Sequence, residues 1–463
     1  MSLLTAKVAA ARAVGELARR AGRGGGTSLP GKVLIALEPD AISELSARLS
    51  RGSVVISATN GKTTTAAMVA SVLARDGVAV VHNQAGANMA GGVASTLLAA
   101  ARGRDRIDGE LGLFEIDEFW LDRIVPQLIP RGIVLGNLFR DQLDRYGELD
   151  TIADRWAAVT SGAGVRGAQL ILNADDPLIA DLGREASNVT YFGLDDPSLA
   201  MPEMQHASDS KHCRRCGAAY VYDVVYLGHL GRYRCPVCGQ ERPAPAVAAE
   251  RIELDGTRGS SFELVTPTGR TRVELPLPGL YNVYNALGAA ALCLGLGVGL
   301  DTVAAGLSEV RAAFGRAERL AVGSVEVQVL LIKNPAGANE ILRTLVLEGD
   351  ELDLLVVLND RTADGRDVSW VWDADFEMLS GRVRRVTCAG TRAGELAVRL
   401  KYAGVPDDRL HVVPGLAPAL DDALAQAPAG RLYVLPTYTA LLELRHELSE
   451  RGHALPFWEP TPV

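Results

Sequence analysis

The sequence is poor in lysine. Of its 47 basic residues only six are lysines, and arginine supplies the rest of the positive charge. The six are Lys7, Lys32, Lys62, Lys211, Lys333 and Lys401. A lysine beside a phosphate-binding motif therefore stands out. With 56 acidic residues the net charge is −9, which argues against a general nucleic-acid binder, because such proteins need a basic surplus to neutralise phosphates.

Long apolar runs are also missing. The longest run made only of apolar residues and glycines, residues 286–300, has 15 residues and four glycines, fewer than the roughly 20 apolar residues that cross a bilayer. Scattered arginines interrupt residues 1–26, which excludes a secretory signal. The apolar spacing there predicts an amphipathic helix that packs on the first domain, with contact to a membrane surface as the alternative. We therefore expect a cytoplasmic location.

Cysteine is scarce and unevenly distributed, which excludes a disulfide-rich secreted protein. Four of the six cysteines form two C-x2-C pairs separated by 18 residues, namely Cys213, Cys216, Cys235 and Cys238. This spacing predicts a zinc ribbon with four cysteine ligands, whose closed coordination makes the metal structural, with reduced free thiols as the alternative. We expect His212 and His229 nearby to be surface residues. Cys293 and Cys388 lie alone in apolar stretches.

The length of 463 residues predicts two or three domains, and 48% hydrophobic with 22% charged residues excludes a disordered chain. Residues 50–200 alternate short β-branched runs with helical patterns, which is typical of a parallel sheet flanked by helices. Residues 200–275 break this rhythm, first with the cysteines and then with an antiparallel pattern, and we interpret them as an insertion. A second αβ series follows from residue 325.

A phosphate-binding loop is predicted at residues 58–65, A-T-N-G-K-T-T-T, between the strand at residues 53–57 and a helix. Backbone N–H groups and the helix N-terminus would surround phosphate oxygens, and Lys62 would neutralise their charge. A threonine hydroxyl would bind Mg²⁺. Ser57 or Ala58 replaces the first glycine of the full motif, so a chance match is the alternative.

Further motifs follow in order. They are E-I-D-E at 115–118, N-L-F-R-D-Q-L-D-R-Y-G-E at 137–148, N-A-D-D-P at 173–177, Y-N-V-Y-N at 281–285 and G-R-A-E at 315–318. Together with the phosphate loop, this series resembles the Mur ligase family, ATP-dependent amide-forming enzymes of peptidoglycan precursor synthesis. Gln142 stands where the family usually has histidine. The acidic cluster taken alone would be a solvated face or a helix cap, and the asparagines would be capping residues.

The resemblance implies a fold and a role for individual residues. It implies a Mur-ligase-like α/β ATPase domain at residues 1–318, with the zinc ribbon inserted at about 206–243, and a smaller C-terminal α/β domain at 319–463. Lys62 and Glu115 are expected to be catalytic, and Thr63 and Glu115 to hold Mg²⁺. The residues expected to contact ATP are Thr59, Asn60, Gly61, Lys62, Thr63, Thr64, Asn173, Asp175, Asn282, Asn285 and Arg316.

Two features depart from most Mur ligases. The phosphate loop starts near residue 58, which leaves no room before it for the domain that holds the uridine nucleotide in the family. We therefore expect a substrate that is not a UDP-linked precursor. Several family members use a carbamylated lysine as a metal ligand, but Lys211, beside the cysteines, is the only lysine between Lys62 and Lys333. We expect that device to be absent.

An acidic loop with two tryptophans, residues 359–377, combines with the zinc ribbon and K-N-P-A-G at 333–337. This combination resembles the MurT family, the synthetase subunits of lipid II isoglutaminyl synthases. The resemblance implies ATP-dependent amidation of the D-glutamate α-carboxyl in the lipid II stem peptide at the cytoplasmic membrane surface. Ammonia would come from a GatD-type class I glutaminase in a heterodimer. Asp367 is expected to orient the histidine of the partner's Cys–His pair, with Asp364 and Asp360 as alternatives.

Two other functions stay open. One is a non-catalytic scaffold that keeps a nucleotide fold and a zinc ribbon to bind a partner. The other is a ligase of the folylpolyglutamate synthetase type, which joins an amino acid instead of ammonia. ATP turnover separates the first from an amidating enzyme, and the ribbon and the D-G-R-D sequence at 364–367 disfavour the second.

Overall fold

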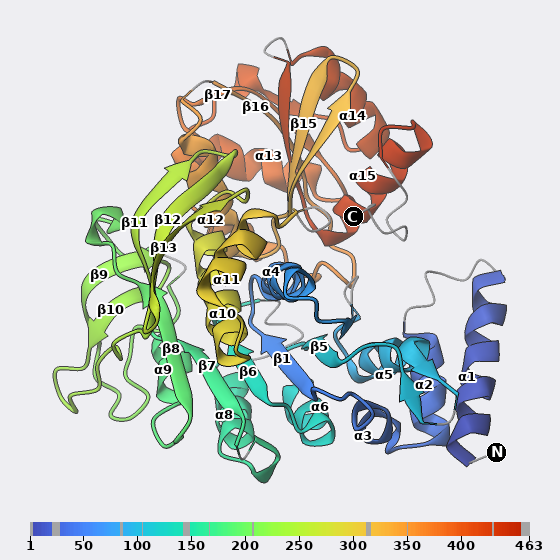
Figure 1. Cartoon of the computed structure of the whole chain (residues 1–463). Coiled ribbons are helices and arrows are strands. Elements are labelled where there is room, and N and C mark those ends of the chain that lie inside the picture. Colours follow the sequence, from blue (N-terminus) through green and yellow to red (C-terminus); the bar gives the residue numbers. More distant parts are fainter. Residues whose placement is uncertain are drawn as a thin grey trace.

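The computed structural model describes residues 3–20, 28–83, 87–103, 105–141, 149–165, 167–205, 208–311, 316–349, 351–427 and 430–454. The described chain forms a large α/β domain around a nine-stranded sheet and a smaller one around a six-stranded sheet. The smaller domain lies above the larger in Figure 1, so that α12 and α4 lie at their junction.

The large sheet has the strand order β13-β12-β11-β8-β7-β6-β1-β5-β2. Its strands from β8 to β2 are parallel, as predicted. They are β1 (Ser53–Ser57), β2 (Val80–His82), β5 (Leu111–Glu115), β6 (Gly132–Leu135), β7 (Gln169–Asn173) and β8 (Val189–Leu194). A separate two-residue hairpin pairs β3 (Ala101–Arg102) with β4 (Arg106–Ile107).

The antiparallel strands after residue 245 extend this sheet. β11 (Val247–Asp255) pairs in parallel with β8, and it continues antiparallel into β12 (Gly259–Thr266) and β13 (Gly269–Leu275). The interpretation of this stretch as part of an insertion is therefore wrong. The alternating pattern correctly predicted that these residues form antiparallel strands. It does not indicate which strand of the large sheet they pair with.

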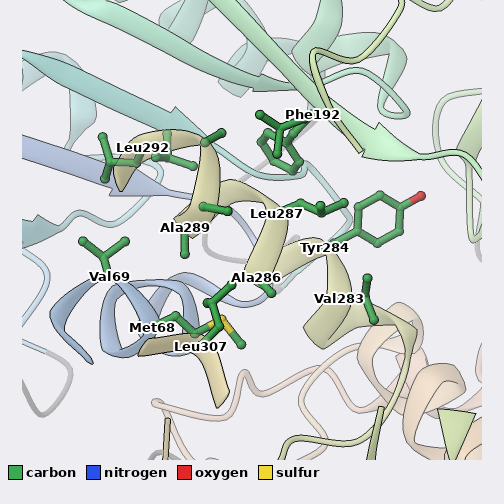
Figure 2. Close-up of a cluster of buried hydrophobic side chains, with 14 of the residues drawn as sticks. Met68, Val69, Phe192, Val283, Tyr284, Ala286, Leu287, Ala289, Leu292 and Leu307 are labelled. Carbon is green, nitrogen blue, oxygen red and sulfur yellow. The ribbon is translucent and has the colours of Figure 1, made fainter. Parts of the chain in front are cut away.

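β1 lies in the middle of the sheet, and all five of its residues are buried. Val54 and Ile56 contribute to the core on one face, whereas Val55 contributes to the core on the other. The first core is covered by α4 (Lys62–Arg75), α10 (Leu280–Gly295) and α11 (Leu300–Ser308). Figure 2 shows Leu287 and Ala289 of α10 packed between Phe192 of β8 and the Met68–Val69 face of α4.

The second core is covered by a layer of helices of 5 to 12 residues. They are α2 (Leu29–Leu37), α3 (Ala41–Ser46), α5 (Ala90–Ala100), α6 (Leu121–Leu128), α8 (Leu149–Thr160) and α9 (Pro177–Asp181). The predicted N-terminal helix, α1 (Leu3–Arg20), packs on this layer through Val8 and Ala11. Among the described residues, no helix combines the length and hydropathy that crossing a membrane requires.

The second sheet has the order β14-β15-β19-β16-β17-β18. It comprises β14 (Arg316–Val322), β15 (Val325–Leu330), β16 (Leu352–Val357), β17 (Val383–Ala389), β18 (Leu410–Val412) and β19 (Arg431–Pro436). One face carries α12 (Pro335–Val346) and α13 (Ala393–Tyr402), and the other carries α14 (Leu416–Ala425) and α15 (Tyr438–Glu450). The predicted boundary between residues 318 and 319 falls inside β14, which already pairs with the second sheet.

The cysteine-rich segment forms a small arm between β8 and β11. Its two strands, β9 (Val221–Leu227) and β10 (Leu230–Arg234), make an antiparallel hairpin. The predicted ribbon therefore has its own sheet, which does not pair with the large one. Residues 206 and 207, at the predicted start of the ribbon, lie outside the described residues.

Candidate active site

The loop between β1 and α4 has the backbone of a phosphate-binding site. Gly61 caps α4 with φ at 91°, a left-handed conformation that glycine adopts without strain. A Cβ at this position would lie 2.0 Å from Asn285 Oδ1. Glycine is therefore required both by the turn and by the close approach of α10.

Lys62 is buried at the start of α4. Its ammonium donates to Glu118 Oε2 at 2.8 Å and to the carbonyl oxygen of Ala58. Burial alone would lower the pKa of Lys62, but the carboxylates of Glu118, Asp117 and Glu115 raise it. The lysine is therefore held charged where a phosphate group would enter.

The pKa values of Glu118 and Asp117 shift in opposite directions in this cluster of buried charges. Burial would raise the pKa of Glu118, but the ammonium groups of Lys62 and Lys333 lower it. Burial raises the pKa of Asp117, and the neighbouring charge of Glu118 adds to the effect. The site therefore holds one firmly ionised carboxylate at Glu118 and one at Asp117 that resists ionisation.

Glu115 lies at the end of β5, beside the first turn of α4. Thr63 Oγ1 donates to Glu115 Oε2 at 2.7 Å. Asn83, just after β2, fixes the Glu115 backbone, accepting from its N–H at 2.9 Å and donating to its carbonyl oxygen at 2.7 Å. A hydroxyl and a carboxylate oxygen at the mouth of a phosphate loop are ligands that suit Mg²⁺, so the predicted pair Thr63 and Glu115 fits that ion.

Residues 137–141, which we call the strap, run beside the phosphate loop after β6. Asn137 accepts from the backbone N–H of Asn60 at 2.9 Å and donates to the Asn60 carbonyl oxygen at 3.0 Å. Phe139 donates its backbone N–H to Thr59 Oγ1 at 3.1 Å. The strap therefore holds two residues of the loop in place. Gln142 and the rest of the predicted motif, residues 142–148, lie outside the described residues.

The predicted ATP residues outside the phosphate loop have different surroundings. Asn285 faces the loop, because its Oδ1 accepts from Thr65 Oγ1 at 3.3 Å and its Nδ2 donates to Asn282 at 3.0 Å. A small pocket is lined by Asn60, Asn137, Asn285 and neighbouring residues. The side-chain N–H of Asn282 donates to the carbonyl oxygen of Pro278 at 2.8 Å. This hydrogen bond stabilises the start of α10.

Asp175 is fully buried and its oxygens already have protein partners. It accepts from Arg242 at 2.5 Å, Tyr284 at 2.7 Å and the backbone N–H of Leu194 at 2.9 Å. Burial raises its pKa, although Arg242 opposes the shift. Its observed contacts therefore join the ribbon arm to α10. Asn173 accepts from the backbone N–H of Asp175 at 3.0 Å.

Two of the other predicted ATP residues take no part in the contacts above. Thr64 is buried within α4, one residue beyond Thr63. Arg316 begins β14, but its side chain lies outside the described part of the structure.

Lys333 and Asn334 reach the site from the smaller domain, and sequence reasoning assigned them no role. Lys333 Nζ pairs with Asp141 of the strap and donates to the carbonyl oxygen of Thr59 at 3.1 Å. Asn334 hydrogen-bonds Asn60. The scarcity of lysine was a usable signal for Lys333. Glu118 was also missed, although it belongs to the E-I-D-E motif.

The four predicted zinc ligands converge in the ribbon. All four sulfur atoms lie within 4.8 Å of one another, and the pairs Cys213–Cys238 and Cys216–Cys235 are 3.5 and 3.4 Å apart. Four thiolates at Zn–S bonds of about 2.3 Å would be about 3.8 Å apart. The donor set therefore fits a tetrahedral Zn²⁺ site with no open position.

The two histidines near the cysteines differ. His212 is exposed as expected, but the same expectation for His229 is wrong, because His229 is fully buried. Its ring packs against Phe139, with the ring centroids 4.6 Å apart. The sequence pattern does not show this, because the contact depends on how the ribbon folds back onto the strap. Cys293 and Cys388 are buried, as the apolar stretches around them indicate.

The three aspartates of the loop at 359–377 have different surroundings. Asp360 accepts from Arg392 at 2.8 Å and Thr391 at 2.7 Å. Asp364 is buried and accepts from the backbone N–H of Thr439 at 2.7 Å. Asp367 is exposed, and its partner among the described residues is the backbone N–H of Ser369 at 2.8 Å, which lowers its pKa. Of these three aspartates, Asp367 is therefore the one that is most accessible to an approaching protein.

Comparison with known families agrees with this geometry. The Mur ligase middle domain model matches residues 56–240, and the MurT ligase C-terminal model matches residues 331–441. The chain is 33% identical to a lipid II isoglutaminyl synthase (glutamine-hydrolyzing) subunit MurT of Streptococcus pneumoniae, over 92% of this chain and 93% of that protein. The chain belongs to the MurT family. A Staphylococcus aureus MurT is also 33% identical, over 84% of this chain and 86% of its own.

Solved structures show that this MurT-family chain has the Mur ligase fold. A pseudomurein peptide ligase type C from Methanothermus fervidus superposes with a TM-score of 0.66 at 23% identity, covering 87% of this chain and 79% of its own. MurF from Acinetobacter baumannii gives 0.63 at 18% identity, covering 90% and 80%. A folylpolyglutamate synthase from Mycobacterium tuberculosis gives 0.58 at 17% identity, covering 91% and 96%. The predicted fold class is confirmed, and identities this low bear on fold alone.

Proposed function

We propose that this MurT-family chain is the synthetase subunit of a glutamine-dependent lipid II isoglutaminyl synthase. It would amidate the α-carboxyl of D-glutamate in the lipid II stem peptide, at the membrane surface where that substrate resides. The similarity to two MurT subunits over most of their length supports this. The observation that carries the chemistry is the charged, buried Lys62 held by Glu118 beside the Thr63–Glu115 pair.

The chain's own groups suit acyl-phosphate chemistry. A carboxylate does not accept ammonia directly, so its oxygen first attacks the γ-phosphorus of ATP, and ADP leaves. Lys62 and the N-terminus of α4 would offset the charge that develops on the transferred phosphoryl group. Lys333 lies close enough to Thr59 to add a second positive charge from the smaller domain. Ammonia then attacks the acyl carbon, and inorganic phosphate leaves.

Two metals are part of the proposal. Thr63 and Glu115 would hold Mg²⁺, which would supply positive charge to neutralise the phosphate groups. The four cysteines would hold a structural Zn²⁺. The proposed contacts to ATP are those of the phosphate loop and of Asn173, Asp175, Asn282, Asn285 and Arg316.

The ammonia would come from a separate glutaminase of the GatD type. Cys293 and Cys388 are buried, and burial raises the pKa of Cys388 to about 12, so neither is an accessible thiolate nucleophile. We assign Asp367 the role of the third member of the partner's triad, because it is the exposed one of the three candidate aspartates, Asp360, Asp364 and Asp367. A histidine oriented by a carboxylate is the arrangement that such nucleophiles need.

The test is reconstitution. The chain is co-purified with a GatD-type glutaminase and incubated with lipid II, ATP, Mg²⁺ and glutamine, and the product is analysed by mass spectrometry. Conversion of the D-glutamate carboxylic acid to its amide, dependent on both ATP and glutamine, is the expected result. Addition of an amino acid would indicate a ligase of the folylpolyglutamate synthetase type. Absence of ATP turnover in the complex would indicate a scaffold.

A further inference from the structure

The hairpin of the ribbon ends in a turn that is buried against the strap. His229 occupies this turn with 0% of its surface exposed. Gly228, just before it, has φ at 54°, and a Cβ there would lie 2.8 Å from Phe139 Cε1. The turn therefore contacts Phe139 from two residues at once, with no free space for a larger residue at 228.

Phe139 connects this turn to the phosphate loop. Its backbone N–H donates to Thr59 Oγ1 at 3.1 Å, and its carbonyl oxygen accepts from the same hydroxyl at 3.3 Å. The Asn137 carbonyl oxygen, two residues earlier, accepts from the backbone N–H of Thr59 at 2.9 Å. A shift of the Phe139 ring therefore moves the backbone that fixes Thr59 and, through Asn137, Asn60.

The hairpin itself is anchored on both sides. Asp176 Oδ2 accepts from the strap at Leu138 N at 2.9 Å and lies 3.4 Å from His229 Nε2. From the smaller domain, Arg343 of α12 donates to the carbonyl oxygen of Tyr226 in β9 at 2.8 Å. The tip is thus held at a defined distance from the strap.

We propose that the tip of the ribbon hairpin positions the phosphate loop for ATP, with His229 as the positioning residue acting through Phe139. The inference rests on the proposed use of ATP by this chain. Its physical basis is packing. The ring of His229 fills the space beside Phe139, and the hydrogen bonds of the strap then fix the positions of residues 59 and 60. The ribbon is then part of the nucleotide site, although its cysteines are not.

Two variants at position 229 test this in the complex with the glutaminase. His229→Ala removes the ring, and His229→Phe keeps a ring of similar size. Gly228→Ala places a methyl group against the Phe139 ring and displaces it without changing His229. His446→Ala, at an exposed position of α15, controls for loss of a histidine, and Leu98→Ala, in the core beneath α5, controls for loss of stability. The readouts are KM for ATP, kcat, the affinity for a non-hydrolysable ATP analogue, and zinc content.

We expect His229→Ala and Gly228→Ala to raise KM for ATP and weaken analogue binding about tenfold, because a displacement below about 1 Å in a binding loop has effects of this order. Zinc content should equal that of the parent, and His229→Phe should restore KM to within about twofold, as similar-volume swaps are tolerated. Parental analogue affinity in His229→Ala, or an equal rise in KM in Leu98→Ala, would overturn the proposal. A parent complex without ATP turnover would instead refute the proposed function.

Discussion

Asn334 donates its side-chain N–H to Asn60 Oδ1 at 3.0 Å, although the two residues belong to different domains. The side-chain Oδ1 of Asn334 also caps α12, accepting from the backbone N–H of Gly337 at 2.8 Å. One side chain therefore holds a helix of the smaller domain against the phosphate loop of the larger one. The bond that Asn334 donates to Asn60 and the helix cap use different atoms and can be separated by substitution, whereas a longer bond of 3.4 Å from Asn60 Nδ2 shares Oδ1 with the cap.

Asn334→Asp should keep the cap and lose the hydrogen bond that the Asn334 amide donates to Asn60 Oδ1. We expect kcat/KM for ATP to fall about tenfold, because a hydrogen bond is lost and a negative charge is placed near the phosphates. Asn334→Ala should also lose about 1 kcal/mol of unfolding free energy with the cap. Steady-state kinetics and thermal denaturation of both variants measure this, and parental kinetics in Asn334→Asp would contradict it.

Glu118→Gln should reveal a pH-dependent contribution to stability. The pKa of Glu118 is lowered in the folded protein from its usual 4.5, so its pairing with Lys62 stabilises the fold above pH 4.5 and is lost as the pH falls through the lowered value. At neutral pH we expect the variant to lose about 3 kcal/mol, because the buried ammonium is left unpaired. The difference from the parent should shrink below about pH 4.5 in urea titrations, and a constant difference down to about pH 3 would contradict the pairing.

Cys216→Ser should empty the proposed zinc site. We expect zinc content below one per chain and a lower melting temperature, by about 2–4 °C for each kcal/mol lost. Cys388→Ala is the matched control, because Cys388 lies in β17 of the other domain and should leave the metal content unchanged. Elemental analysis of protein purified without chelator provides the measurement. Full zinc occupancy in Cys216→Ser would exclude a four-cysteine site.

Asp367→Asn should separate the supply of ammonia from glutamine from the amidation step itself. Glutamine-dependent amidation should fall by roughly 10²–10⁴, the range for loss of a triad carboxylate, while amidation with added ammonium chloride stays at the parental rate. Asp364→Asn is the comparison variant, because Asp364 holds Thr439 and its loss should affect both activities through stability. Equal loss under both conditions in Asp367→Asn would refute the triad role.

Local patterns predicted much of this molecule. The apolar runs before Lys62 and up to Glu115 indicate parallel strands, because such runs are buried on both faces of a sheet. Gly61 then lies at the strand-to-helix turn, and Thr63 lies in the first turn of the helix that follows. The cysteine spacing predicted the cluster equally well, since its geometry is set within one short segment.

Contacts between distant segments could not be predicted in this way. Lys333 lies 274 residues from Thr59, and no periodicity connects the two. His229 is polar and follows a glycine, so its surroundings suggest an exposed turn, and only the folding of the ribbon onto Phe139 buries it. The pairing of β11 with β8 is of the same kind. In each case tertiary packing overrides what the local sequence favours.

The alternation of β1 between two cores has a consequence for local unfolding. To open this strand, the chain must break hydrogen bonds to β5 and β6 and expose apolar side chains on both faces. Its amides should therefore exchange with solvent hydrogen only through global unfolding. The phosphate loop begins where this strand ends, so the loop can rearrange around a nucleotide while its attachment point stays among the most protected parts of the chain.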